Sequence, residues 1–419
     1  MKTIGLMASA LFAVGTLSAA LEPLSPVDGK VVPLVPDAQK TVMNLPTLEE
    51  RIKLFVEDRK NGKKLRHDKY WRKAAPLVLE VKTTAGETGP WKVLIGKQAD
   101  LSDARVWYLK TTKTDKASGR EKEAEGSKSV QRIEVPLANL EIATTYYWKV
   151  LCRGRCGFGC SPKHNCKESK TLAASAVASF VTEDFAPRWI AIEGRVGNFR
   201  DFGGRIGLGG RRVRQGMAYR GQGLNDNSVT GETQGRNRLT VEDVKYLTGT
   251  LGIRTDLDLR GYGEVVDMKE SPLGSGVAFI NNSSSCYKGV FEEGGMKTMA
   301  KNVRVFCDKS NYPIYFHCIG GADRTGALAY VLNGVLGVSR QEAETDWEST
   351  FYPRIPDENP DPNFWCRESH FDEGLAKYGT ADTPWNERVV LYLRDCGITD
   401  GEMSAIRGIL LEGPVMKAQ

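Results

Sequence analysis

Short stretches of alternating apolar and polar residues dominate the first half of the chain. They lie at residues 76–81, 91–95, 105–109 and 145–151, and residues 178–182 look like a closing strand. A period of two places successive side chains on opposite faces of a strand, and turns rich in glycine, lysine and serine separate these stretches. We therefore expect an antiparallel β-sandwich over residues 21–184.

The pattern changes in the second half. Residues 314–316 form a short apolar run typical of a buried strand, and apolar residues at helical spacing follow at 325–336. Capping boxes that begin further helices are Ser339 with Glu342 and Thr399 with Glu402, and Thr383-Pro384 begins another. Strands interspersed with helices predict an α/β domain over residues 185–416.

The first twenty residues have the pattern of a secretory signal peptide. Lys2 precedes an apolar run at 4–17, and the small residues Ser18 and Ala20 suit cleavage after Ala20. The run is shorter than the roughly 20 apolar residues of a membrane-spanning helix. We expect residues 1–20 to be removed and the protein to be secreted or periplasmic, without a membrane span.

The net charge of the chain does not indicate a particular class of binding partner. The chain has 58 Lys+Arg and 52 Asp+Glu, a formal net charge of +6 that is spread along the sequence and does not indicate nucleic-acid binding. A denser basic stretch consists of Arg195, Arg200, Arg205, Arg211, Arg212 and Arg214. We interpret it as a solvated hairpin surface in preference to a source of charge for a polyanionic substrate. The Lys- and Arg-rich run at 59–73 is also expected to be a solvated face.

Four cysteines cluster near the end of the first half. They are Cys152, Cys156, Cys160 and Cys166, with His164 between them. Their spacing differs from the paired Cys-x-x-Cys pattern of zinc sites, and an exported chain meets an oxidising environment. Two local disulfides are favoured over a metal site, and sequence does not choose among the three possible pairings.

The segment between the strand at 314–316 and the helix at 325–336 carries the candidate chemistry. Residues 317–326 read His-Cys-Ile-Gly-Gly-Ala-Asp-Arg-Thr-Gly. At a helix N-terminus, free backbone N–H groups and the helix dipole favour a bound anion such as phosphate. The expected anion-binding residues are Ile319, Gly320, Gly321 and Ala322. The positive field at this helix end favours the thiolate form of Cys318, which is the expected nucleophile. The planar guanidinium of Arg324 can bind two phosphate oxygens at once.

This segment resembles the active-site loop of the cysteine-dependent protein tyrosine phosphatase superfamily. Other stretches follow the order seen in a bacterial and fungal subfamily: 198–204 (Asn-Phe-Arg-Asp-Phe-Gly-Gly), 218–220 (Ala-Tyr-Arg), and 252–260 with Glu264. The resemblance implies a central sheet wrapped by helices, a phosphocysteine intermediate, and no metal or other cofactor. Leu140, Thr144, Tyr146 and Val150 resemble the spacing around the tyrosine corner of fibronectin type III domains, which suggests such a module for the sandwich.

The resemblance also suggests roles for individual residues. Asp323 is the expected general acid, with a brace for the loop as the alternative. Asp258, at the end of a strand, is the second candidate, and for it a structural role bonding loop amides is favoured. Thr325 either hydrogen-bonds the sulfur or caps the helix. His317 is expected to orient the loop.

Three functions follow from these residues. The leading one is hydrolysis of phosphotyrosine or similar phosphate monoesters, and the second is hydrolysis of phosphoinositides or inositol phosphates. In members of this superfamily that prefer phosphoinositides, lysines often occupy the positions held here by Ile319 and Ala322 and add positive charge for polyphosphorylated rings. Their absence here makes the second function less favoured. The third is a non-catalytic exported binding or adhesion protein that uses the sandwich for protein or glycan contact. The segment at 355–378, with Trp365 and Phe371, either shapes substrate access or serves as a structural flap.

Overall fold

The computed structural model describes much of the chain in two compact units. The described residues are 21–47, 49–51, 53–54, 74–83, 87, 89–110, 130–153, 171–194, 196–225, 239–265, 268–350 and 367–413. The first unit consists of the chain up to Val32, Pro76–Pro136 and Thr144–Val181. The second takes Pro33–Ala75, Leu137–Ala143 and Thr182–Gln419. The expected signal peptide at 1–20 and the basic run at 59–73 lie outside the described residues.

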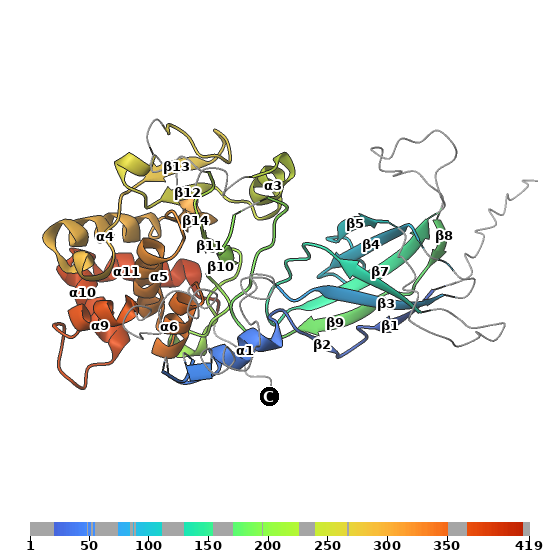
Figure 1. The fold of residues 1–419 in the computed structure, drawn as a ribbon, viewed down its shortest axis with the longest axis horizontal. Coiled ribbons are helices and arrows are strands. Elements are labelled where there is room, and N and C mark those ends of the chain that lie inside the picture. Colours follow the sequence, from blue (N-terminus) through green and yellow to red (C-terminus); the bar gives the residue numbers. More distant parts are fainter. Residues whose placement is uncertain are drawn as a thin grey trace, which may run out of the picture. The chain divides into compact units, whose positions relative to one another are not determined.

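The first unit contains two β-sheets (Figure 1). The smaller has the order β1-β3-β6, with β1 (Leu21–Ser25), β3 (Leu77–Thr83) and β6 (Val130–Val135). The larger has the order β2-β9-β7-β4-β5, with β2 (Val31–Val32), β9 (Ala178–Thr182), β7 (Thr145–Arg153), β4 (Trp91–Gly96) and β5 (Arg105–Leu109). The short strand β8 (Thr171–Ala174) pairs with β7.

Alternating burial explains why these segments are strands. Every second residue of β3 is buried, and in β7 the side chains of Trp148 and Val150 are fully buried. The indole N–H of Trp148 donates to the carbonyl of Pro26 at 2.9 Å, which satisfies its buried polar group. The four stretches identified by their period of two coincide with strands β3, β4, β5 and β7, and the expected closing strand is β9.

Cys152 belongs to the core of this unit. It lies in β7 opposite Trp91 and Ala173, is buried, and is a free thiol. Burial raises the pKa of this thiol and favours its neutral form. The expectation that Cys152 joins a local disulfide is therefore not met in the structure. Cys156, Cys160, His164 and Cys166 lie outside the described residues.

The second unit is built on a mixed five-stranded sheet. Its order is β10-β11-β14-β12-β13, with β10 (Arg200–Asp201), β11 (Ala218–Gly221), β14 (Ile314–His317), β12 (Thr255–Asp258) and β13 (Ala278–Asn281). Strands β11, β14, β12 and β13 run parallel, and β10 is an antiparallel edge strand. The strand that precedes the candidate cysteine is therefore central, and the carboxyl ends of its parallel neighbours meet beside it.

Helices cover both faces of this sheet (Figure 1). The longer ones are α4 (Glu293–Val305), α5 (Asp323–Leu336), α6 (Arg340–Glu348), α9 (Arg367–Leu375), α10 (Trp385–Asp395) and α11 (Asp400–Leu410). The shorter are α1 (Asp37–Met43), α3 (Val241–Lys245) and the π-helix η2 (Tyr246–Thr250). The 3-10 helices are η1 (Leu208–Gly210), η3 (Tyr262–Glu264), η4 (Tyr287–Phe291) and η5 (Lys309–Asn311). Ser339 and Thr399 are N-caps, as expected.

Alternate residues of β14 face two separate cores. Ile314 and Phe316 pack in the cluster that contains α5, whereas Tyr315 packs in a second cluster with Tyr219 and Leu247. All residues of α5 from Thr325 onward are buried. The sequence pattern suggested only one apolar face for this helix, but its alanines and glycines let other helices approach the remaining sides.

Gly326 illustrates this close packing, since a Cβ there would lie 2.4 Å from the Trp347 indole nitrogen. Among the helices that the structure describes, none has the combination of length and apolar character that a membrane span requires.

Candidate active site

The loop between β14 and α5 places Cys318 at its base. Cys318 directly follows β14, is 3% exposed, and is a free thiol. The loop closes tightly because Gly321 adopts a φ of +65°, and a Cβ there would lie 2.2 Å from the carbonyl oxygen of Gly221. No L side chain fits that position without moving β11. The glycine is therefore required by both conformation and space.

The carbonyl groups of this loop are bound from behind. The donors are Asn198 Nδ2 to Gly320 and Gly321 (3.2 and 3.0 Å), Arg220 Nη2 to Gly321 (3.0 Å), and the Gly223 amide to Ile319 (3.0 Å). Within the part of the chain that the structure describes, the amides of residues 319–322 donate to no protein acceptor. With the carbonyls held outward, these amides remain available to an anion above the cysteine.

Arg324 is fixed by Glu264. Its Nη1 and Nη2 donate to the two Glu264 carboxylate oxygens at 2.5 and 2.9 Å, and Nη1 also lies 3.4 Å from the Leu259 carbonyl. Burial alone would lower the pKa of Arg324, but the hydrogen bonds to Glu264 outweigh the effect of burial and raise this pKa. A guanidinium has five N–H donors. The Nε edge, with the second hydrogen of Nη2, has no acceptor among the described residues and can bind two oxygens of a phosphate.

His317 lies beneath the cysteine in a polar cluster. Its Nε2 is 2.9 Å from Asp256 Oδ1, and its Nδ1 is 3.1 Å from the Cys318 carbonyl oxygen. Burial disfavours the imidazolium, but the carboxylates of Asp258 and Asp256 outweigh that effect and raise the pKa of His317. Asp256 also accepts from the Ser271 hydroxyl at 2.7 Å. The ring is held in one orientation and fixes the turn from β14 into the loop.

Asp258 is fully engaged by its neighbour Arg260. It accepts the Arg260 backbone amide at 2.9 Å and the Arg260 guanidinium at 2.6 to 3.0 Å, using both oxygens. Burial raises its pKa, but His317 and Arg260 outweigh this, and the pKa lies below its usual value. An ionised carboxylate held in this way braces the turn after β12 and has no proton to give at neutral pH.

The start of α5 carries the other two candidates. Asp323 is its half-buried first residue. The N-cap position is Ala322, which supplies no side-chain cap, so Thr325 does not cap the helix. The Thr325 hydroxyl is buried and has no hydrogen-bond partner among the described groups. A buried unpaired hydroxyl is costly, and its position in the loop helix suggests a partner that forms only during reaction.

Behind the loop, one aspartate binds three arginines. Asp346 in α6 accepts from Arg200 Nε at 2.9 Å, Arg205 Nη2 at 3.0 Å and Arg220 Nη1 at 2.6 Å, and all four side chains are buried. Burial opposes the Asp346 charge, yet the arginines hold its pKa far below the usual range. Burial, and then the charge of Arg220, lower the pKa of Arg200 to about 9.

This Asp346 network reaches the loop by two routes. Arg220 donates directly to the Gly321 carbonyl. Arg200 donates to Asn198 Oδ1 at 2.5 Å, and Asn198 in turn holds the Gly320 and Gly321 carbonyls. Sequence reasoning missed Asp346, although Arg200 and Arg220 belong to the motifs that it singled out. No local pattern marks Asp346, because its partners lie at least 126 residues away along the chain.

The interpretation of the basic stretch as a solvated hairpin is wrong for Arg200 and Arg205. Both are buried because Asp346 neutralises them. Three others bind at the periphery: Arg211 to the Glu412 carbonyl, Arg212 to Asp184, and Arg214 to the Leu411 carbonyl. Arg195 lies outside the described residues. Arg200 and Arg205 therefore belong to the buried Asp346 network and do not form a solvated surface.

Cys286, Cys307 and Cys396 are partly buried, and Cys307 and Cys396 are free thiols. Among the described residues, no group of three His, Cys, Asp or Glu side chains could hold a metal ion. Of the segment at 355–378, the first part, with Trp365 and Cys366, lies outside the described residues. Its Phe371 packs in the main core against Trp347, Tyr330 and Tyr392.

A search of curated proteins gives no match. Among solved structures, the core catalytic domain of the PP-IP phosphatase SIW14 from S. cerevisiae in complex with citrate matches 42% of this chain and 94% of its own, at 14% identity and a TM-score of 0.24. Residues 191–359 match the family described as the tyrosine phosphatase family. This match, over the region that holds Cys318 and Arg324, supports a phosphatase of the cysteine-dependent kind in the second unit.

Proposed function

We propose that this chain is an exported cysteine-dependent phosphatase that hydrolyses phosphate monoesters, above all phosphotyrosine. The observation that carries the proposal is the convergence of donors on one point. The loop that follows the buried Cys318 holds both the amides that have no protein acceptor among the described residues and the open Nε edge of Arg324. Such an arrangement stabilises the charge of a transferring phosphoryl group.

The first step of the proposed reaction transfers the phosphoryl group to sulfur. The Cys318 thiolate forms the S–P bond as the P–O bond to the leaving group breaks, and Arg324 holds the equatorial oxygens. Asp323 gives its proton to the departing oxygen, a contribution of about 10² to 10⁴ in rate for a poor leaving group. Asp258 is less suited to this role, because both its oxygens bind Arg260 and its pKa is lowered.

The second step hydrolyses the phosphocysteine. Asp323, now ionised, takes a proton from water, whose oxygen attacks phosphorus as the S–P bond breaks and the thiolate returns. We assign the buried Thr325 hydroxyl to the sulfur as it leaves, since it has no other partner among the described groups. The overall reaction consumes one water and releases inorganic phosphate, without a metal in the proposed scheme.

Charge around the loop favours a simple monoester over a polyphosphorylated ring. The loop holds uncharged Ile319 and Ala322 after the cysteine, and the charges of Arg200 and Arg205 are directed to the buried carboxylate of Asp346. Export rests on the signal-like pattern of residues 1–20 alone. The substrate is therefore proposed to be a phosphotyrosine-like ester outside the cytosol.

The experiment compares Cys318→Ser with the unaltered chain on p-nitrophenyl phosphate and on a phosphotyrosine peptide. We expect hydrolysis to be lost and rapid quenching of the unaltered enzyme to trap phosphate on Cys318. Cys307→Ser is the matched control, because Cys307 is a free thiol elsewhere in the unit. Ordinary turnover by Cys318→Ser would overturn the proposal.

A second comparison tests the acid. Asp323→Asn should lower kcat/KM, which reports the phosphoryl transfer to Cys318 and not the later hydrolysis, by about 10² to 10⁴ for an alkyl phosphate. The loss for an activated aryl phosphate should be far smaller, because a good leaving group needs no proton. Equal losses on both substrates would assign Asp323 to bracing the loop. A panel of inositol phosphates hydrolysed faster than the phosphopeptide would overturn the proposed substrate class.

A further inference from the structure

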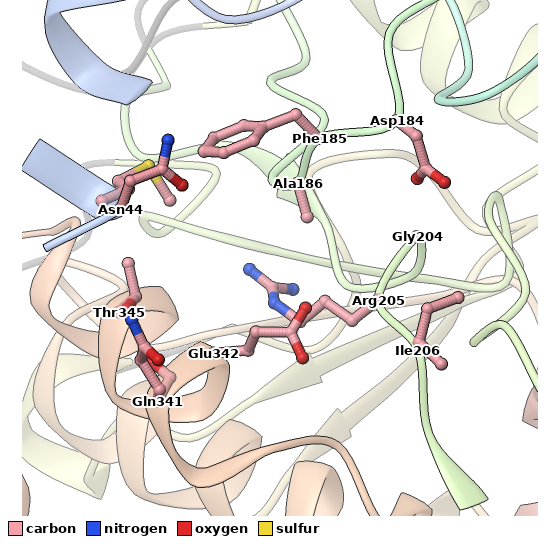
Figure 2. Close-up of a pocket in the computed structure, with 11 residues that line it drawn as sticks. Asn44, Asp184, Phe185, Ala186, Gly204, Arg205, Ile206, Gln341, Glu342 and Thr345 are labelled. Atoms are coloured by element: carbon pink, nitrogen blue, oxygen red, sulfur yellow. The ribbon is translucent and has the colours of Figure 1, made fainter. Parts of the chain in front are cut away.

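A cavity of about 320 Å³ lies in the second unit, apart from the candidate active site (Figure 2). Its wall comes from the end of α1, the start of α6, and residues 184–186 and 204–206. This volume is near the lower end for small-molecule sites, which span about 300 to 1,000 Å³. The space is therefore suited to a compact ligand.

Arg205 supplies the one cation on this wall within the described part of the chain. Its side chain is only 3% exposed, and in Figure 2 its guanidinium points toward the middle of the cavity. Nη2 donates to Asp346 and Nη1 lies 3.4 Å from the Phe202 carbonyl. Acceptors in the described part of the chain use two of the five N–H donors of this guanidinium, which leaves three for a ligand.

The charge balance around Arg205 favours an anion. Asp346 carries one negative charge against the three guanidiniums of Arg200, Arg205 and Arg220. Buried charges are costly unless they are compensated. The two acidic residues of the wall are engaged elsewhere. Asp184 binds Arg212 with both oxygens at 2.8 Å, and Glu342 accepts from the Ser339 hydroxyl at 2.8 Å.

The other residues of the wall indicate the chemistry of the ligand apart from its anionic group. Phe185 and Ile206 present apolar surface, and Gln341 is an exposed amide at the edge. The carboxylate of Glu342 would repel a dianion such as phosphate more than a single charge. We propose that this cavity binds a small monocarboxylate, with its carboxylate on Arg205 and its apolar body against Phe185 and Ile206.

Binding at this cavity is linked to the catalytic loop through Asp346. The same carboxylate that accepts from Arg205 holds Arg220, which donates to the Gly321 carbonyl. A second negative charge on Arg205 reduces the positive field of the network behind the loop. Inorganic phosphate should then bind the loop about 2- to 5-fold more weakly, the effect of a solvent-screened charge pair, and reciprocity requires phosphate to weaken carboxylate binding equally.

Calorimetric titration of the full chain with sodium benzoate tests the site. The titration is done with inorganic phosphate at saturation, so that the catalytic loop is occupied. We expect one benzoate site, and Arg205→Gln should weaken it by about 10- to 100-fold through loss of charge-assisted hydrogen bonds. Unchanged affinity in Arg205→Gln, or no benzoate binding once phosphate occupies the loop, would overturn the proposal.

Two variants of opposite charge at position 341 test the proposal even if Arg205→Gln fails to fold. Gln341 is exposed on α6 and can be changed without disturbing the core. Gln341→Glu should weaken benzoate binding by about 2- to 5-fold and Gln341→Lys should strengthen it by a similar factor. Equal affinities in the two variants would contradict a carboxylate in this cavity. A phosphate affinity that benzoate leaves unchanged would contradict the link through Asp346.

Discussion

Glu264 binds Arg324 through two parallel hydrogen bonds of 2.5 and 2.9 Å, and thereby sets which edge of the guanidinium faces the candidate phosphate site. The carboxylate is itself fixed, because it also accepts from the Gly261 amide at 2.7 Å within the short helix η3. Burial opposes its charge, but Arg324 and the Gly261 amide hold the pKa of Glu264 below its usual value. Arg324 is therefore oriented before any substrate arrives.

Glu264→Gln should reduce kcat/KM for an aryl phosphate by about 10- to 100-fold, since a misplaced catalytic group costs factors of that size. Part of the loss should appear in kcat, because Arg324 contacts the phosphoryl group throughout the reaction. Steady-state kinetics on p-nitrophenyl phosphate measure it. Glu293→Gln is the control, because Glu293 forms an exposed pair with Lys297. Equal activity in the two variants would contradict the positioning role of Glu264.

Gly321→Ala should destabilise the protein and remove phosphatase activity. Its Cβ would collide with the Gly221 carbonyl oxygen at 2.2 Å, and φ is +65°. We expect a loss of about 1–3 kcal/mol in the free energy of unfolding. Gly320→Ala is the matched control, because a Cβ there meets nothing closer than 3.9 Å. Thermal unfolding of both variants checks the prediction, and equal stability would contradict the tight closure at Gly321.

His317 should make stability depend on pH. Its pKa is raised by Asp258 and Asp256 against the effect of burial, so the folded state holds a proton that the unfolded state releases at lower pH. The stabilisation is complete below the unfolded value of about 6.5 and disappears as pH rises through the folded value.

Urea unfolding of the unaltered chain and of His317→Asn, between pH 6 and pH 9, measures this effect. The stability difference in favour of histidine should shrink as pH rises. A difference that stays constant or grows would show that His317 is neutral in the folded state.

Asp346→Asn should destabilise the second unit by about 3–5 kcal/mol, because it leaves three buried guanidiniums without their counter-ion. Asp400→Asn is the control, since Asp400 forms an exposed pair with Arg394, and its loss should be below about 1 kcal/mol. Denaturant unfolding measures both. A cost for Asp346→Asn as small as that of Asp400→Asn would contradict the central role of Asp346 in the network.

Local patterns predicted some of the elements. Alternation identified β3, β4, β5 and β7, and the capping signals at Ser339 and Thr399 correctly placed the starts of α6 and α11. These signals succeed because side-chain period and capping act within a few residues. The interpretation of Arg200 and Arg205 as solvated was wrong because it also used only neighbouring residues. A run of charges in the sequence cannot distinguish a solvated arginine from one that is paired inside the protein.

The sequence by itself determined that a cysteine, two glycines and an arginine stand between a strand and a helix, which is enough to predict an anion-binding loop around Cys318. Only the tertiary structure decided which groups hold that loop. Glu264 lies 60 residues from Arg324, and Asp346 lies 126 residues from Arg220. Such pairs form when strands and helices pack, and their strength comes from burial away from water, which no local spacing of residues encodes.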